Sequence, residues 1–191
     1  MDYTNYKKSR NLAWEILLKE GVTDLPVMVG KLCTQMGIRI EYFSAPAGNS
    51  DGCCLFSAGH PTIYVARDRP RQRQRFTAAH ELGHLLLGHV GKFNLVNREP
   101  TATDNPIEQE ANVFASRLLA PACVLWALNI HTPEEIAELC QISYQAAKFR
   151  AQRMELLYQR NKFLTSELEV AVYKQFEPFI RRKEFLRRSG S

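Results

Sequence analysis

The chain has 191 residues, of which 45% are hydrophobic and 24% are charged, and its formal net charge is +5. This balance predicts a globular protein of one domain, or of one domain with a small appendix. No apolar run approaches the ~20 residues that span a bilayer, and the N-terminus lacks a signal-peptide pattern, so we expect a cytoplasmic protein. The five cysteines form no CxxC pair, which argues against a cysteine-based zinc ribbon and predicts reduced, buried thiols.

The basic residues gather in two interrupted runs, Arg67 to Arg75 and Arg181 to Arg188. A positive charge of this size permits contact with nucleic acid but does not require it. Runs of this kind more often form a solvated face, and that is the interpretation we prefer.

The order of hydrophobic and turn-forming residues predicts an α+β fold with a small antiparallel or mixed sheet of about three strands. The helix expected over 23–37 would be capped by Thr23 or Asp24. A helical tail expected over 161–191 would be interrupted by Pro178. In chain order, the expected elements are a helix over 5–20, a helix over 23–37, a strand over 38–43, a hairpin of strands 52–57 and 61–66, a helix over 71–88, a helix over 106–119 and two helices within 132–160.

The helix over 71–88 is apolar on every side, which predicts burial, yet it carries His80, Glu81 and His84. The two histidines are four residues apart, about 40° around the helix axis, and so point the same way. One zinc ion bound by both histidines, with Glu81 as the base that takes a proton from bound water, explains this HExxH pattern. Gly83 costs about 1 kcal/mol relative to alanine inside a helix, which predicts a close approach to its backbone.

A third zinc ligand must come from another segment. His89 is one place early for the HExxHxxGxxH pattern, so we expect it to cap or follow the helix end. The helix over 106–119 offers Glu108 and Glu110, about 200° apart around its axis. Glu108 projects from the buried stripe and is the preferred ligand, with Glu110 as the alternative. The glutamate that is not a ligand is then expected to be a surface carboxylate near the helix N-terminus.

Three segments together resemble the ImmA/IrrE family of zinc-dependent metallopeptidases: "RFTAAHELGHLLLGH", "EQEANVFASRLLAP" and "TPEEIAELCQISYQAAKFR". The resemblance covers roughly residues 10–155. It implies that His80, Glu81 and His84, with the ExxxN stretch that begins at Glu108, form the zinc site. It also implies a peptidase that cleaves helix-turn-helix repressors and thereby derepresses mobile-element or stress genes. Too few residues remain for the sensory domain of the radiation-response branch, which favours the mobile-element branch.

The resemblance suggests a metallopeptidase domain over 1–130 and a helical extension over 131–191 packed on the same core. The helices within 132–160 and the tail beyond them are not needed for the zinc site, so we expect them to dock the substrate, with Tyr144, Lys148 and Arg150 exposed. Their helix-turn-helix-like pattern leaves a DNA-binding protein, or a non-catalytic repressor-binding protein, as alternatives. The donor for the oxyanion is left open among Tyr64, Tyr144 and His131.

Overall fold

The chain forms two compact units. Residues 1–10 and 28–115 make the first unit, and residues 11–27 and 116–191 make the second. Compact units are not necessarily independent domains, so the boundary predicted at residue 130 stays a prediction. The computed structural model describes residues 2–45, 50–90 and 105–189.

The first unit holds a three-stranded sheet made of β1 (Arg39–Phe43), β2 (Gly52–Ser57) and β3 (His60–Ala66). The strand order is β1-β3-β2, with β1 parallel to β3 and β2 antiparallel to it. The sheet is therefore mixed, and β2 and β3 form the predicted hairpin. Together with the helices, this confirms the predicted α+β class.

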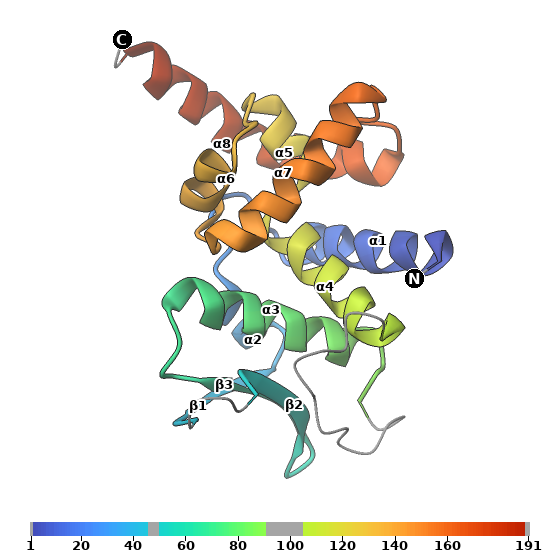
Figure 1. Cartoon of the computed structure of the whole chain (residues 1–191), viewed down its shortest axis with the longest axis vertical. Coiled ribbons are helices and arrows are strands. Elements are labelled where there is room, and N and C mark those ends of the chain that lie inside the picture. Colours follow the sequence, from blue (N-terminus) through green and yellow to red (C-terminus); the bar gives the residue numbers. More distant parts are fainter. Residues whose placement is uncertain (1, 46–49, 91–104, 190–191) are drawn as a thin grey trace. The chain divides into compact units, whose positions relative to one another are not determined.

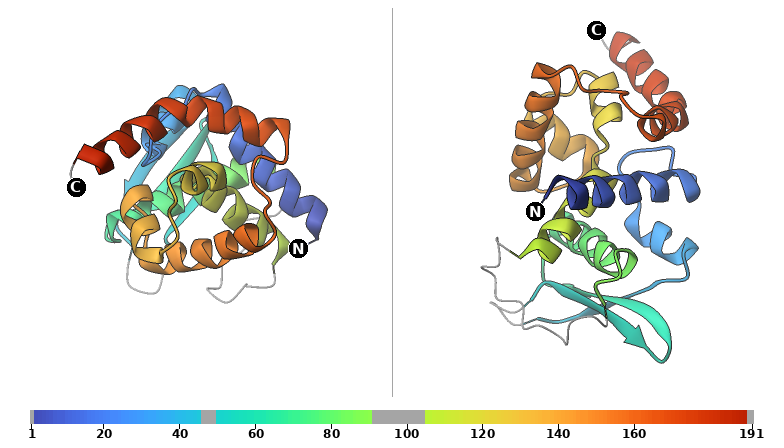
Figure 2. Two further views of the ribbon diagram at one scale, coloured as in Figure 1. Left: turned by 90° about the horizontal axis from the view of Figure 1, so that it is seen from above. Right: turned by 90° about the vertical axis from the view of Figure 1, so that its right-hand side faces the viewer.

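Helix α3 (Arg71–Leu86) lies along one face of this sheet (Figures 1 and 2). A β-carbon at Gly52 in β2 would point at the Thr77 side chain of α3, so the row that contains Gly52 faces the helix. Val65 pairs with Gly52 and is 1% exposed, and Ile63, two residues before it, is fully buried. Because side chains alternate along a strand, these residues form the core between sheet and helix.

The middle of α3 is buried on all sides, as its sequence predicts; the buried residues are Thr77, Ala78, Ala79, Glu81, Leu82, Gly83 and His84.

At the start of α3, the basic run predicted from the sequence meets an acidic partner. Arg69 donates to Asp51 at 2.7 Å, and Arg73 also pairs with Asp51. Part of the basic run therefore anchors the chain that leads into α3, and it is not wholly a solvated face.

Helix α2 (Val29–Gln35) is shorter than predicted and begins after Met28. The predicted start at Thr23 or Asp24 was wrong: residues 22–28 are not helical, and both side chains have other partners. The Thr23 hydroxyl donates to the Asp24 carboxylate at 2.7 Å, and Asp24 also pairs with Arg182. Helix α2 begins six residues after Thr23, with no side-chain cap hydrogen bond at Met28.

Helices α1 (Tyr3–Lys19) and α4 (Pro106–Leu119) contribute residues to both units, and the second unit also holds four further helices. Two of these, α6 and α7, are the predicted pair, and Thr132 and Glu135 form a capping box at the start of α6. The short helix after Pro121 was not predicted. The four helices are α5 (Ala122–Ala127), α6 (Pro133–Cys140), α7 (Tyr144–Gln159) and α8 (Glu167–Ser189).

Helix α8 runs through Pro178, so the predicted interruption there was wrong. A proline inside a helix costs about 3 kcal/mol. Phe176, Phe179 and Ile180 flank Pro178 and are all at most 4% exposed. Burying three such side chains contributes about 1.5–3 kcal/mol each, which outweighs the loss at the proline.

The five cysteines are free thiols, and all are buried except Cys53, which is partly exposed. Burial raises the pKa of Cys33 and of Cys123 to about 12, so both thiols are protonated at neutral pH. This agrees with the reduced, buried thiols predicted from the sequence. No helix in the described part of the chain is long and apolar enough to cross a membrane.

Candidate metal centre

His80 and His84 turn their Nε2 atoms toward one point beside α3. The two Nε2 atoms are 3.0 Å apart, and the ring planes meet at 70°. His84 is 3% exposed, so this pair lies inside the first unit. The arrangement follows directly from the four-residue spacing, which puts both side chains on one side of the helix.

Glu108 completes the group from the first turn of α4. Its Oε2 lies 3.1 Å from the His80 Nε2, and its Oε1 lies 3.3 Å from the His84 Nε2. One ligand atom from each of the three residues lies within 4.8 Å of the others. Hydrogen bonds from the two histidines hold the pKa of Glu108 well below its usual range, so the carboxylate is ionised at neutral pH.

The register of α4 explains why Glu108 reaches this point. Ala111, Phe114 and Ala115 are fully buried and form one stripe of the helix. A β-carbon at Gly83 would lie 3.0–3.2 Å from Phe114, so α4 comes close to α3 at a position where α3 has no side chain. The close approach predicted at Gly83 is therefore confirmed. Glu108 comes three residues before Ala111 and faces the same way.

Asn112 contacts the His80 ring on the side that faces away from the group. Its Oδ1 lies 3.0 Å from the His80 Nδ1, the ring nitrogen that faces away from the group. A neutral histidine that donates from Nδ1 presents the lone pair of Nε2, which is the form that binds a metal. The sequence placed Asn112 in the ExxxN stretch but did not reveal this role.

Glu110 lies outside the group of His80, His84 and Glu108. The prediction that the second glutamate would be a surface carboxylate was wrong. It is 8% exposed, and its Oε2 lies 3.2 Å from the Nε2 of His89. His89 follows the end of α3, as predicted, and its Nδ1 lies 3.0 Å from the Nδ1 of His84. Burial lowers the pKa of His89, which favours the neutral ring.

Glu81 is 1% exposed and faces the sheet side of α3. A β-carbon at Gly52 would lie 3.6 Å from the Glu81 Cγ, so the Glu81 side chain runs past β2 where that strand has no side chain. Gly52 is a residue that sequence reasoning missed. A glycine at the start of a strand gives no signal until the helix facing it is known.

We expect Gly52→Ala to lower the free energy of unfolding by about 1–3 kcal/mol through overpacking. The added β-carbon would lie 2.5 Å from the Thr77 Cγ2 and 2.6 Å from the backbone oxygen of Tyr64, and the latter cannot rotate away. Urea denaturation of the metal-free protein measures the effect.

Gly30→Ala in α2 is the matched control, because a β-carbon there meets nothing within 4 Å. Alanine is the better helix former, so Gly30→Ala should leave stability unchanged or raise it by at most about 1 kcal/mol. Equal stability of the two variants would show that the contact between β2 and α3 is looser than the structure has it.

Of the three side chains considered as oxyanion donors, Tyr64 alone belongs to the same unit as this group. Tyr64 alternates with Ile63 and Val65, so its side chain lies on the sheet face away from α3. Tyr144 and His131 belong to the second unit, where the His131 ring stacks on Tyr158 with centroids 4.4 Å apart. Within residues 2–45, 50–90 and 105–189, the interactions seen assign no oxyanion donor.

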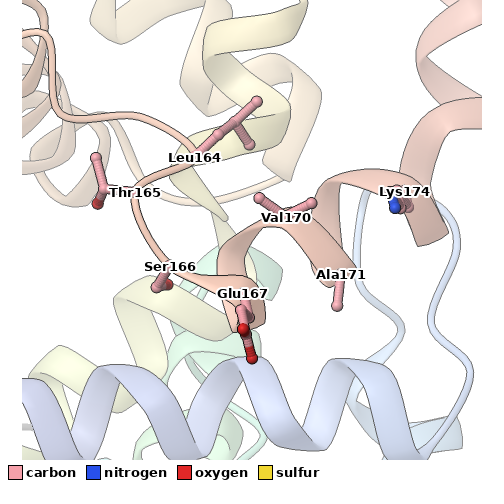
Figure 3. A pocket seen from close by; sticks show the side chains of 7 residues that line it. All are labelled: Leu164, Thr165, Ser166, Glu167, Val170, Ala171 and Lys174. Atoms are coloured by element: carbon pink, nitrogen blue, oxygen red, sulfur yellow. The ribbon is translucent and has the colours of Figure 1, made fainter.

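A separate hollow in the second unit is lined by the segment before α8 and the first turns of that helix (Figure 3). The hydrogen bonds beside it are local. The backbone N–H of Thr165 donates to Glu169, and the backbone N–H of Glu169 donates to the Ser166 hydroxyl at 3.2 Å. The hollow therefore lies at the capped start of α8.

The donors at the His80, His84 and Glu108 group are two imidazole nitrogens and one carboxylate oxygen. This is the donor set of catalytic zinc sites, which leave one position for water or substrate. In both histidines Nε2 faces the group while Nδ1 has a separate partner, as metal-binding histidines require. The residues present therefore fit a metal ion.

Residues 33–152 match the family Peptidase_M78, described as an IrrE N-terminal-like domain. The chain belongs to the Peptidase_M78 family. The match covers more than half of the chain and includes His80, His84 and Glu108 with their hydrogen-bond partners. Peptidase_M78 is a metallopeptidase family, so the resemblance seen in the sequence is confirmed, and a metal at this group is expected.

Other comparisons add little. None of the curated proteins is similar enough in sequence to match the chain. A Mycobacterium tuberculosis transcriptional regulator of known structure is similar with a TM-score of 0.49 and 12% identity. The similarity covers 86% of this chain and 52% of that one, so the chain spans about half the length of the regulator. A likeness this distant says nothing about activity or partners.

Proposed function

We propose that this Peptidase_M78 protein is a zinc-dependent endopeptidase that cleaves a helix-turn-helix repressor and so derepresses mobile-element or stress genes. The observation that carries the proposal is the group formed by His80, His84 and Glu108, with Glu81 buried next to His80 on the same helix. A protein that only binds a repressor needs no general base in such a place.

The chemistry divides among five side chains. His80, His84 and Glu108 would hold the zinc ion, and Asn112 orients the His80 ring. When bound, zinc supplies a Lewis acid that polarises the scissile carbonyl and acidifies water. Glu81 takes the proton of the attacking water and later delivers it to the leaving amine.

The substrate part of the proposal rests on the family resemblance and on the exposed face of α7. Tyr144 is 55% exposed and Phe149 is 63% exposed, and such aromatic side chains are enriched in protein interfaces. Lys148 is exposed between them. The expectation that Arg150 is exposed was wrong: it is 1% exposed, and its Nε donates to the backbone oxygen of Ala120 at 2.8 Å.

The burial of Arg150 also weakens the alternative of a DNA-binding protein. A recognition helix needs several exposed polar and basic side chains for phosphates and base edges. On α7 the exposed large side chains include Phe149 and Leu156, which cannot donate hydrogen bonds to DNA. A protein partner suits this face better than a duplex does.

We expect rapid, zinc-dependent cleavage of a helix-turn-helix repressor that a neighbouring gene encodes. We expect little cleavage of casein or of random peptides. An intracellular peptidase needs such restriction, and docking before cleavage supplies it. The measurement is a comparison of cleavage rates on the three substrates, with a chelator and with zinc added back. Efficient digestion of casein without preference for the repressor would contradict the proposed substrate class.

The double variant Tyr144→Ala/Phe149→Ala tests the docking face. Loss of two exposed aromatic contacts of an interface costs about 1–2 kcal/mol each or more, so cleavage of the repressor should fall at least about tenfold. Zinc content should not change. Tyr42→Ala/Phe56→Ala, which removes two exposed aromatic side chains from β1 and β2, is the matched control.

A further inference from the structure

We propose that His89 and Glu110 are positioning residues for the metal ligand His84, which they hold through a chain of hydrogen bonds. This inference rests on the proposed zinc site. His89 contacts the ring of His84, and Glu110 contacts the ring of His89. Both residues would therefore act through the ring of His84.

The geometry fits one protonation pattern throughout. With the Nε2 of His84 aimed at the metal position, its Nδ1–H donates to the Nδ1 of His89, 3.0 Å away. The His89 ring then carries its own proton on Nε2 and donates it to Oε2 of Glu110 at 3.2 Å. Each neutral imidazole uses one donor and one acceptor, and the chain ends on an acceptor-only carboxylate.

The end of α3 builds this contact. Gly88 takes a left-handed conformation with φ of +73°, which glycine adopts without strain. The backbone N–H of His89 donates to the carbonyl of His84 at 3.0 Å, and that of Gly88 donates to the carbonyl of Leu85 at 3.3 Å. These two bonds form a Schellman turn, which folds the chain back so that the His89 ring lies against the His84 ring.

Burial supports a function for the pair. The side chains of His89 and Glu110 are each 11% exposed, and a carboxylate with so little solvent needs hydrogen bonds to compensate its lost hydration. The two metal-facing histidines are thus supported differently: Asn112 accepts from His80, whereas His84 is backed by a second imidazole and a carboxylate. Partners of this kind fix the orientation of a ligand ring and raise its basicity.

Zinc affinity of the full chain is the direct test, measured by competition with a chromophoric chelator. We expect His89→Ala to raise the zinc dissociation constant about 10–100-fold, the usual effect of losing an outer partner of a ligand. His89→Asn should recover most of this loss, because its Oδ1 accepts from His84 at the place of the His89 Nδ1. Glu110→Ala should weaken zinc binding by less than Glu108→Ala, which removes a direct ligand.

His60→Ala and Glu41→Gln are the controls, since both residues are exposed in the same unit and outside the hydrogen-bond chain. Absorption of the Co²⁺-substituted protein supplies a second readout: His89→Ala should shift the d–d bands, and His89→Asn should restore them. Thermal unfolding of the metal-free variants shows whether each one folds. If His89→Ala does not fold, Glu110→Ala takes its place as the test variant.

Wild-type zinc affinity and an unchanged Co²⁺ spectrum in folded His89→Ala would overturn the inference. It would also fail if asparagine at position 89 were no better than alanine, because the role would then be packing alone. Failure of the wild-type protein to bind zinc would instead contradict the proposed function. The two failures are therefore distinguishable.

Discussion

Replacement of both metal-facing histidines, His80→Ala/His84→Ala, is expected to reduce zinc from about one ion per chain to none. The two Nε2 atoms are 3.0 Å apart, and together they supply two of the three donor atoms of the group. A single carboxylate cannot hold zinc at the affinity of a three-ligand site. Elemental analysis of protein purified without added metal measures the change.

The matched control is His60→Ala/His131→Ala, which removes two exposed histidines that lie outside the metal group. This variant should keep its zinc. Zinc saturating the wild-type protein at 100 times its dissociation constant stabilises the fold by about 2.7 kcal/mol, so only the first variant should lose a zinc-dependent rise in melting temperature. A folded His80→Ala/His84→Ala protein with unchanged zinc content would refute the assignment of the site.

The variant Glu81→Gln is expected to keep both fold and zinc but to cleave the repressor about 10²–10⁴-fold more slowly, the range that general base catalysis contributes. Glutamine has nearly the same shape and fits the buried place beside Gly52, yet its amide does not accept the proton of water. Single-turnover cleavage with excess enzyme measures the chemical step apart from substrate binding.

Glu41→Gln makes the same chemical change at an exposed position of β1 and should cleave at the wild-type rate. Zinc content of both variants is measured in parallel, so that a loss of metal is not mistaken for a loss of the base. Near-normal cleavage by zinc-loaded Glu81→Gln would show that another group takes the proton.

Much of the metal group could be predicted from local sequence. The spacing of His80 and His84 acts within a single helix, where 3.6 residues per turn sets the direction of every side chain. The preference for Glu108 over Glu110 used the same periodicity within α4, and the structure brings Glu108 to the histidines. Its role as a zinc ligand stays a prediction until metal binding is measured.

Three errors have a common origin in contacts between distant segments. The early start predicted for α2 was wrong, and Asp24, expected as a cap, pairs instead with Arg182, 158 residues later. The interruption predicted at Pro178 failed because buried aromatic side chains on both sides of it keep α8 packed. Arg150 carries a full charge that suggests exposure, yet the backbone oxygen of Ala120 receives its hydrogen bond inside the second unit.

The sequence alone thus specified the class of fold, the HExxH helix and the family, because each depends on patterns within one segment or on their order along the chain. Only the tertiary structure revealed which residues contact the site residues. Gly52 leaves room for Glu81, Asn112 contacts His80, and His89 with Glu110 supports His84. In each case the role comes from where two separately predictable segments touch. Periodicity shows which face of a helix is buried, but the residue that it meets there is set by packing across the whole unit.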